Sequence, residues 1–489
     1  MATTIYVDDD CSLIQNGTKS KPFCTIQQGI DATVSGDSVS VATGTYTGFG
    51  NKNLTWTGKD IKVFGAGVSR TLISLGDSGR AFALTDPSVT TRSSVSDFAI
   101  SGGDVTGEDV KNGGAILVSN AGLTVRDCAI RLCTADNGGA IAVEFGGTIV
   151  IRSSAIQEHT ATFSGGAIYV NNSNADIMTS SITLSTAEGG SGGGIAFLSN
   201  DGVINSQTIT DTTIADNTVS NGNAGDGGGG VSFIVTGLDP AVDTMKINRC
   251  TIQGNDAVAQ AGPLGGGVLF KRACQGEPTS STTGIVLTIE NSFIVENTAT
   301  VPSIPPPCTL CSARGGGIFV DLCVLTGETV SICNNTIADN SVGGGGSAKQ
   351  DEGGGLFAFE VDDLVVHDTI FWNNTAPDGG NQIAMVNGTL DIAFTDAGGT
   401  DGVCPLEDDT NVLLEFAAME TCCAGEPNTC NTNLDPEFVT TAGDFHLESD
   451  SQLKDLGSEF GCGLFDIDLE DRVSGERVDI GADEIQQSP

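Results

Sequence analysis

The chain has 489 residues, of which 67 are glycine and 39% are hydrophobic, and its 21 basic and 62 acidic residues give a net charge of −41. The glycines cluster in twos and threes instead of recurring at every third position, which excludes collagen, and the apolar content excludes a disordered chain. The negative charge disfavours nucleic acid and anionic membranes as partners, and no run of about 20 apolar residues predicts a transmembrane segment.

Residues 1–60 predict an N-terminal cap and a first coil. Within the stretch 25–34, Ile26, Ile30 and Val34 recur at every fourth position, which indicates a short amphipathic helix that covers the apolar end of a solenoid. Cys11 and Cys24 are close enough in sequence to form a local disulfide.

Residues 61–385 contain the main signal, a repeated unit. Each copy has an Ile or Phe, two variable residues and usually Asn, followed later by a glycine cluster and alternating apolar residues. The eight copies begin at Ile130, Ile156, Ile182, Ile214, Ile252, Ile294, Ile337 and Phe371. Alternation after each glycine cluster predicts strands, about three per copy, and the shortest spacing of 26 residues fits one turn of a right-handed parallel β-helix.

Equivalent residues of successive coils stack in such a solenoid and form ladders. The asparagines of the repeat are expected to share one column, in which each amide bonds to the turn backbone and to its neighbours. The predicted ladder consists of Asn217, Asn255, Asn297, Asn340 and Asn374. Cys133, His159 and Ser185 occupy the same column earlier in the chain, and His159 is interpreted as a polar turn residue in preference to a site residue.

The fourth to seventh copies carry insertions between the asparagine and the glycines. Loops from one corner of consecutive coils project side by side, so we expect the insertions to form one raised interaction patch. The insertions are residues 218–228, 256–264, 298–314 and 341–352. Cys308 and Cys311, within the longest insertion, and Cys323 and Cys333, just after it, are further disulfide candidates.

Residues 386–489 lack the glycine clusters of the repeat and contain several cysteines. We expect them to form the last coils and a cysteine-rich C-terminal cap. The fifteen cysteines favour disulfides and an extracellular or cell-surface location over zinc binding. Six sequons are candidates for glycosylation if the source secretes through a eukaryotic-type pathway: Asn16, Asn53, Asn171, Asn334, Asn373 and Asn387.

The Gly-Gly-Ala-Ile runs and the Ile/Phe-x-x-Asn motifs of residues 95–385 resemble the repeats of chlamydial polymorphic membrane proteins and other bacterial β-helix surface proteins. The start of the chain and the ending 479–484 (Asp-Ile-Gly-Ala-Asp-Glu) are similar to pectate-lyase-like β-helix proteins with a C-terminal surface-anchor segment. This resemblance implies an exported protein, and it implies adhesion as the activity of many relatives.

Enzymatic activity is the main alternative, because polysaccharide lyases and hydrolases also use this fold. A lyase needs a base and a cation for the developing charge, and the absence of Lys and Arg between Arg152 and Lys246 disfavours such a site across the middle of the solenoid. Nearby basic residues keep one conceivable: Lys246, Arg249, Lys271 and Arg272. No motif assigns a catalytic residue to any of the three histidines, His159, His367 and His446. We therefore leave catalytic residues unassigned.

Acidic clusters indicate Ca²⁺ as a candidate ligand, although the fold requires no cofactor and none of the clusters matches an EF-hand. The clusters are residues 8–10, 108–109, 407–409 and 466–471. Our prediction is an exported structural or adhesive β-helix that binds a protein or glycan partner through its corner loops. The alternatives are a polysaccharide-degrading enzyme, a self-associating filament or viral subunit, and a calcium-dependent matrix component.

Overall fold

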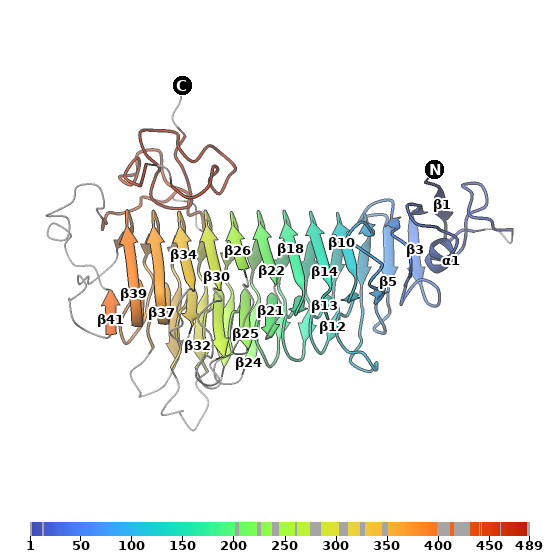
Figure 1. Cartoon of the computed structure of the whole chain (residues 1–489), viewed down its shortest axis with the longest axis horizontal. Helices are drawn as coiled ribbons and strands as arrows, with labels where there is room; N and C mark the ends of the chain where they lie inside the picture. Colours follow the sequence, from blue (N-terminus) through green and yellow to red (C-terminus); the bar gives the residue numbers. More distant parts are fainter. Residues whose placement is uncertain are drawn as a thin grey trace. The chain divides into compact units, whose positions relative to one another are not determined.

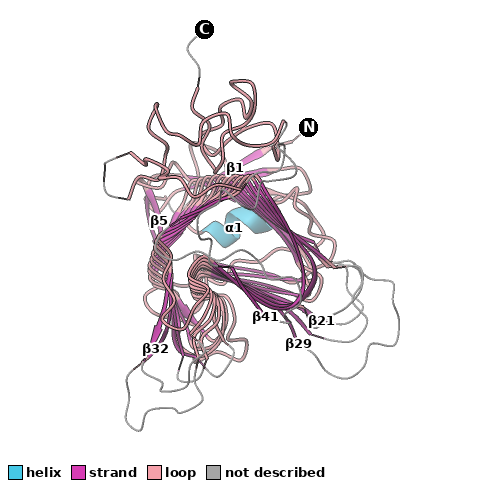
Figure 2. Cartoon of the chain, turned by 90° about the vertical axis from the view of Figure 1, so that its left-hand side faces the viewer, coloured by secondary structure: helices cyan, strands magenta, loops and turns pink. Residues whose placement is uncertain are grey.

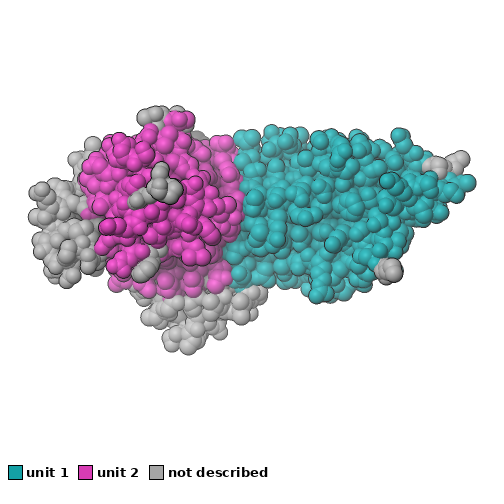
Figure 3. Space-filling view, turned by 90° about the horizontal axis from the view of Figure 1, so that it is seen from above, with its two compact units in different colours: residues 1–199, 205–208 teal, residues 200–204, 209–489 magenta. Residues whose placement is uncertain are grey.

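This computed structural model describes the chain in several ranges, and the thin grey trace in Figure 1 marks the remainder. The described residues are 2–11, 14–200, 205–222, 226–236, 244–259, 262–273, 285–302, 312–322, 328–344, 351–398, 411–414, 431–439, 441, 443–459 and 461–486. They form two compact units, coloured separately in Figure 3: unit 1 comprises residues 1–199 and 205–208, and unit 2 comprises residues 200–204 and 209–489. The predicted boundaries at residues 60 and 385 remain predictions.

Unit 1 is a stack of coils whose strands pair in parallel. Its large sheet contains β1 (Thr4–Val7), β2 (Ser38–Val41), β4 (Lys62–Phe64), β6 (Phe82–Leu84), β7 (Ser94–Ser96), β9 (Ile116–Ser119), β10 (Gly122–Arg126), β13 (Ile141–Glu144), β14 (Thr148–Arg152), β17 (Ile168–Asn171), β18 (Asn174–Met178), β21 (Ile195–Asn200) and β22 (Ser206–Thr210). Its middle sheet contains β3 (Gly44–Thr47), β5 (Thr71–Ser74), β8 (Ala99–Ser101), β11 (Ala129–Arg131), β15 (Ala155–Gln157) and β19 (Ser181–Thr183). Its short sheet contains β12 (Thr134–Ala135), β16 (Thr160–Ala161) and β20 (Thr186–Ala187).

Unit 2 repeats the same three sheets. Its large sheet contains β25 (Val231–Thr236), β26 (Thr244–Asn248), β29 (Val268–Ala273), β30 (Val286–Glu290), β33 (Ile318–Asp321), β34 (Thr329–Cys333), β37 (Leu356–His367), β39 (Ile383–Ala393) and β41 (Asn411–Leu414), which is antiparallel to β39. Its middle sheet contains β23 (Thr213–Ala215), β27 (Thr251–Gln253), β31 (Phe293–Val295), β35 (Thr336–Ala338), β38 (Ile370–Trp372) and β40 (Asp396–Gly398). Its short sheet contains β24 (Thr218–Gly222), β28 (Asp256–Ala259), β32 (Thr298–Val301) and β36 (Ser341–Gly344). Figure 2 shows β29 and β32 on different walls of a coil.

Alternation of inward and outward side chains explains the strands. In β14, Ile149 and Ile151 are fully buried in the lumen, whereas the intervening residues are partly exposed. The repeat isoleucines stack in register, as in the pairing of Ile130 with Ile156. Each complete coil therefore forms a parallel β-helix turn, with four strands instead of the predicted three, because a short strand such as β16 or β28 follows the ladder position.

Two different requirements explain the paired glycines. The first glycine of a pair has a left-handed backbone, with φ of 67° at Gly165 and 64° at Gly265. The second glycine lies against the next coil, since a Cβ on Gly266 would stand 2.3 Å from the carbonyl oxygen of Gly316. Neither position accommodates another residue without strain.

The five predicted ladder asparagines form one continuous hydrogen-bonded column in unit 2. The side-chain oxygen of Asn297 accepts hydrogen bonds from the backbone N–H and the amide of Asn255, at 3.0 and 2.9 Å. The amide of Asn297 in turn donates to Asn340 at 3.0 Å and to the Ile252 carbonyl at 2.9 Å. In unit 1, His159 occupies the same column, is 1% exposed and bonds the Cys133 N–H and the Ile130 carbonyl, so it is a structural rung.

The N-terminal helix is shorter than predicted. Helix α1 (Ile26–Asp31) begins with Thr25 and Gln28 in a capping box, and Ile26 and Ile30 are fully buried. Val34 lies beyond the helix and is 67% exposed, which corrects its predicted place on the apolar face. Figure 2 shows α1 within the outline of the coils.

Candidate functional site

A C-terminal segment, defined here as the described residues of 431–486, packs on the outer face of the middle sheet of unit 2. In Figure 1 it lies above the ends of large-sheet strands such as β34 and β37. The outward residues of β31 and β38 are large and apolar there, in contrast to Ala155 and Gln157 at the equivalent outward positions of β15 in unit 1. Two clusters of contacts join the sheet to the segment: Phe293, Val295 and Ala338 with Phe445 and Ala482, and Ile370 with Leu447, Leu453 and Ile480. Apolar burial therefore holds the segment on the sheet.

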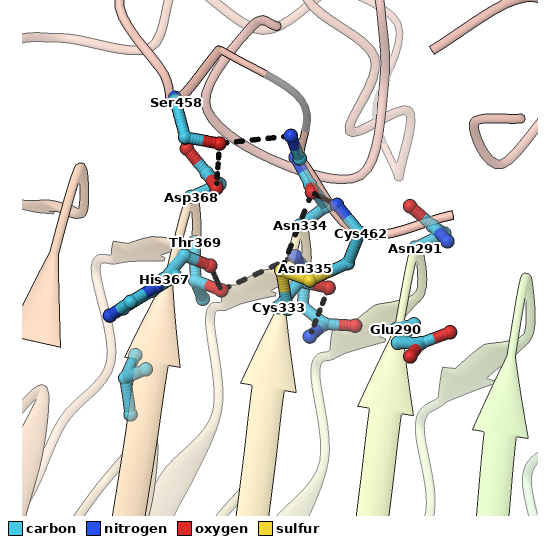
Figure 4. The surroundings of a disulfide bond; sticks show 12 residues. Glu290, Asn291, Cys333, Asn334, Asn335, His367, Asp368, Thr369, Ser458 and Cys462 are labelled. Atoms are coloured by element: carbon cyan, nitrogen blue, oxygen red, sulfur yellow. Dashed lines mark hydrogen bonds between the residues drawn. A yellow bond between two sulfur atoms is a disulfide. The ribbon is translucent and has the colours of Figure 1, made fainter. Parts of the chain in front are cut away.

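Polar anchors come from a corner column, defined as the left-handed residues between the large and middle sheets of unit 2. Its members, all with φ between 50° and 51°, are Asp211, Arg249, Asn291, Asn334, Asp368 and Phe394. Asn334 Oδ1 accepts from the Cys462 N–H at 2.7 Å, and Asp368 accepts from the N–H and hydroxyl of Ser458 at 2.6 and 2.8 Å (Figure 4). Asn291 accepts from the buried Arg472 guanidinium at 2.6 Å.

Beyond these anchors, a cleft of about 310 Å³ opens between the segment and the sheet, and we call it the C-terminal cleft. Its lining comprises Asp211, Thr212, Thr213, Arg249, Thr251, Phe293, His446, Ile467, Asp468 and Leu469. The first six residues belong to the coils and the last four to the segment. This volume is at the lower end of the range of small-molecule sites.

One side of the C-terminal cleft holds an ion pair. Arg249 donates from Nε to Asp211 Oδ1 at 2.6 Å and from Nη2 to Oδ2 at 3.2 Å. The pair is bidentate and partly exposed, with 16% of the Arg249 side chain accessible. Of the four basic residues considered for a lyase, Arg249 alone is in the described lining of the cleft.

The opposite side holds His446 between carboxylates. Its Nδ1 lies 2.6 Å from Asp444 Oδ1 and its Nε2 lies 3.1 Å from Asp468 Oδ2. The potential ligand atoms of His446, Asp468 and Asp483 all lie within 4.8 Å of one another. His446 also packs edge-on against the Phe293 ring, with ring centroids 5.0 Å apart.

The electrostatics of this group follow from burial and crowding. Burial opposes the imidazolium form of His446, but the hydrogen bond with Asp444 and the charges of Asp483 and Asp468 outweigh it and raise its pKa above the ordinary value. Burial raises the pKa of Asp483 to about 6, although the Leu447 N–H donates to its carboxylate at 2.8 Å. The hydrogen bond from His446 lowers the pKa of Asp444.

An imidazole and two carboxylates could together hold a divalent cation. This mixed donor set suits Zn²⁺ better than Ca²⁺, which prefers oxygen ligands alone, and a third carboxylate on the other ring nitrogen is the usual support of a metal-binding histidine. The sequence placed Asp468 in an acidic cluster but did not connect it with His446, 22 residues earlier, or with Asp483, 15 residues later. The fold of the C-terminal segment brings the three side chains together in space. Residues 407–409 lie outside the described residues.

The predicted cysteine pairs have different outcomes. Cys11 and Cys24 form a disulfide. Cys333 is bonded to Cys462, not to Cys323 as the short spacing predicted, because the end of β34 faces the C-terminal segment. Cys308, Cys311 and Cys323 lie outside the described residues, as do the tips of all four corner loops, so the raised patch stays a prediction.

The sequons also differ in accessibility. Asn16, Asn53, Asn373 and Asn387 are exposed, and Asn171 is partly buried. Asn334 is fully buried against the C-terminal segment. Glycosylation of the six sequons stays a prediction. No described helix has the length and apolarity needed to cross a membrane.

The strand pairing and the cleft define this chain as a parallel β-helix protein with a lateral ligand-sized site. A scan against protein-family models and a search of curated proteins both find no match. Among solved structures, pectate lyase Pel9A is 15% identical over 99% of this chain and 96% of its own, with a TM-score of 0.43. XylC in complex with xylose is 10% identical over 99% and 94%, with a TM-score of 0.49. The A-module of the mannuronan C-5 epimerase AlgE4 of Azotobacter vinelandii is 14% identical over 80% and 97%, with a TM-score of 0.35. At these values the similarities carry no argument about chemistry.

Proposed function

We propose that this chain is an extracellular β-helix protein that acts on a polysaccharide and binds a sugar residue in the C-terminal cleft. The observation that carries the proposal is the composition of the cleft. A bidentate Arg249–Asp211 pair, threonine hydroxyls and the Phe293 ring converge with His446 and Asp468 in a space large enough for one or two sugar rings. The two disulfides among the described residues support an oxidising compartment.

Each part of the cleft has a role in this proposal. Arg249 and Asp211 offer donors and acceptors to sugar hydroxyls, and Phe293 offers an apolar surface. A divalent cation held by His446, Asp468 and Asp483 would supply Lewis acidity and bind sugar oxygens. Asp444 fixes the orientation of the His446 ring through Nδ1, which directs Nε2 toward Asp468.

The test combines binding with product analysis on a panel of neutral and acidic polysaccharides. Calorimetric titration, with and without Zn²⁺ or Ca²⁺, measures binding, and chromatography of the incubated polysaccharides detects shortened, unsaturated or epimerised products. We expect Asp468→Asn to weaken binding roughly tenfold, equivalent to the loss of one charge-assisted contact.

The matched control is Glu470→Gln, which removes an exposed carboxylate of the same segment outside the cleft lining. Equal binding by the wild type and Asp468→Asn, or no binding to any polysaccharide of the panel, would contradict the proposal. In that case, adhesion through the corner loops becomes the preferred function. Deletion of residues 299–313 tests it, because an adhesive protein should then lose its binding to the surface partner.

A further inference from the structure

The C-terminal cleft exists only while the C-terminal segment is seated. Its floor, which includes Thr213, Thr251 and Phe293, belongs to the coils, whereas His446, Ile467, Asp468 and Leu469 belong to the segment. All three residues of the candidate cation group also lie in the segment, and His446 is held against Phe293 of the sheet. Whatever controls the seating of the segment therefore controls the site.

Among the described residues, one disulfide cross-links the segment to the coils. Cys333 is the last residue of β34, and Cys462 lies on the segment, 129 positions later (Figure 4). Cys333 pairs in register with Glu290 on one side and with His367 on the other. The anchors at Asn334 and Asp368 bond Cys462 and Ser458 beside the disulfide, and further hydrogen bonds join the segment to the coils at Arg472 and Ala482.

Buried carboxylates gather within the segment. Within the segment, Asp466, Asp479, Asp483 and Glu484 are each at most 8% exposed. Arg472, which is 1% exposed, is the one basic residue buried among them in the described part of the segment. An excess of buried carboxylates costs free energy that the apolar contacts must offset.

From this arrangement, the geometry points to the Cys333–Cys462 disulfide as a redox latch that keeps the C-terminal cleft assembled. An external dithiol that reduces the bond becomes a disulfide itself and leaves two thiols, at Cys333 and Cys462. The segment then leaves the middle sheet, and the cleft loses the wall that carries His446 and Asp468. The consequence for sugar binding rests on the proposed function, whereas the release of the segment does not.

Two residues of the native chain report directly whether the segment is packed on the sheet, Trp372 by its fluorescence and Arg472 by its protection from trypsin. Trp372 packs against both apolar clusters under the segment, and the chain has only one other tryptophan, Trp56 in unit 1. Arg472 is buried, so trypsin reaches its carboxyl side only after the segment opens. In a Trp56→Phe background, we compare Cys333→Ser/Cys462→Ser with Cys11→Ser/Cys24→Ser, which removes the disulfide of unit 1.

We expect the first double variant to shift the Trp372 emission to longer wavelength and to accelerate cleavage after Arg472 roughly tenfold, while the second leaves both unchanged. Circular dichroism establishes that the sheets persist. If the first double variant does not fold, the folded wild type is treated with dithiothreitol, and mass spectrometry identifies the reduced pair.

Unchanged emission and unchanged protection of Arg472 after loss or reduction of the bond would overturn the latch. This result is distinct from failure of the proposed function, because neither reporter requires a sugar or a cation. Conversely, release of the segment without any sugar binding by the oxidised protein supports the latch and rejects the proposed function.

Discussion

At the scale of single residues, buried polar side chains determine how the coils stack. The sequence reveals the asparagine ladder because one amide can bond both the turn backbone and its neighbours, and the repeat places the asparagines at equal positions. A second column, which includes Ser292 and Asn335, was not predicted, although Cys250 N–H donates to Ser292 Oγ and Ser292 N–H donates to Asn335 Oδ1, each at 3.0 Å. Its residues vary between Ser, Thr, Cys and Asn, which obscures the pattern.

Replacement of a ladder asparagine should destabilise unit 2. Asn297→Ala removes the acceptor of the Asn255 backbone N–H and one of the two acceptors of the Asn255 amide, together with the amide that donates to Asn340 and to the Ile252 carbonyl, at a cost of about 2–4 kcal/mol. Urea denaturation measures the loss. Gln253→Ala is the control, because its amide bonds Glu296 in an exposed setting where water can replace it, and an equal loss in both variants would contradict the expectation.

Asp396 predicts a pH dependence of stability. Burial raises its pKa to about 7, and Oδ2 has no hydrogen bond among the described residues, while Oδ1 accepts from Thr432 and Leu434. Because the folded state holds the proton more tightly than the unfolded state, the stability associated with Asp396 falls as the pH rises from about 4 to about 7. Asp396→Asn should therefore raise the melting temperature at pH 8 by several degrees and change it little at pH 4, as calorimetry can show. A larger gain at pH 4 would contradict the assignment.

At the scale of elements, the glycine turns show which close contacts the coil requires. Gly266→Ala would place a Cβ against the carbonyl oxygens of Gly316 and Thr298, at 2.3 and 2.4 Å, so we expect a loss of about 2 kcal/mol or more. Gly343→Ala is the matched control, since a Cβ there meets nothing within 4 Å. Chemical denaturation of both variants compares them, and equal stability would show that the turn can relax.

The packing of the C-terminal segment on the outer face of the middle sheet was not predicted, although the sequence contains a signal for it. The outward positions of the middle sheet change from Ala155 and Gln157 in β15 to Phe293 and Val295 in β31 and to Ile370 and Trp372 in β38. Large apolar outward residues on two coils separated by only one indicate that another part of the chain covers them. The sequence could not identify residues 431–486 as the cover, because they contain no described helix or strand whose periodicity would mark a buried face.

At the scale of the whole molecule, repeat spacing was sufficient to predict the solenoid, because each coil contacts mainly its neighbours in sequence. The site could not be predicted in the same way. It combines Arg249 with His446 and Asp483, which are separated by long intervals that no repeat relates. The sequence indicated two parts of it, the acidic cluster that contains Asp468 and the basic residue Arg249.

The net charge of −41 predicts that salt stabilises the folded chain. Stacked coils concentrate acidic side chains, so their mutual repulsion opposes folding and is screened at a Debye length of about 8 Å in physiological salt. We expect the melting temperature to rise between 10 mM and roughly 150 mM NaCl. Scanning calorimetry in the two buffers measures the change, and a fall would indicate that attractive ion pairs such as Arg272–Glu328 dominate.

The Cys333–Cys462 bond also determines how the protein carries mechanical tension. A pull applied near the C-terminus reaches Cys462 and passes through sulfur directly into the end of β34. The intervening residues, including the last coils and most of the segment, are thereby bypassed and bear no load while the bond is intact. Under such tension the last coils would remain folded, and the force would be resisted by the ordered strands around β34.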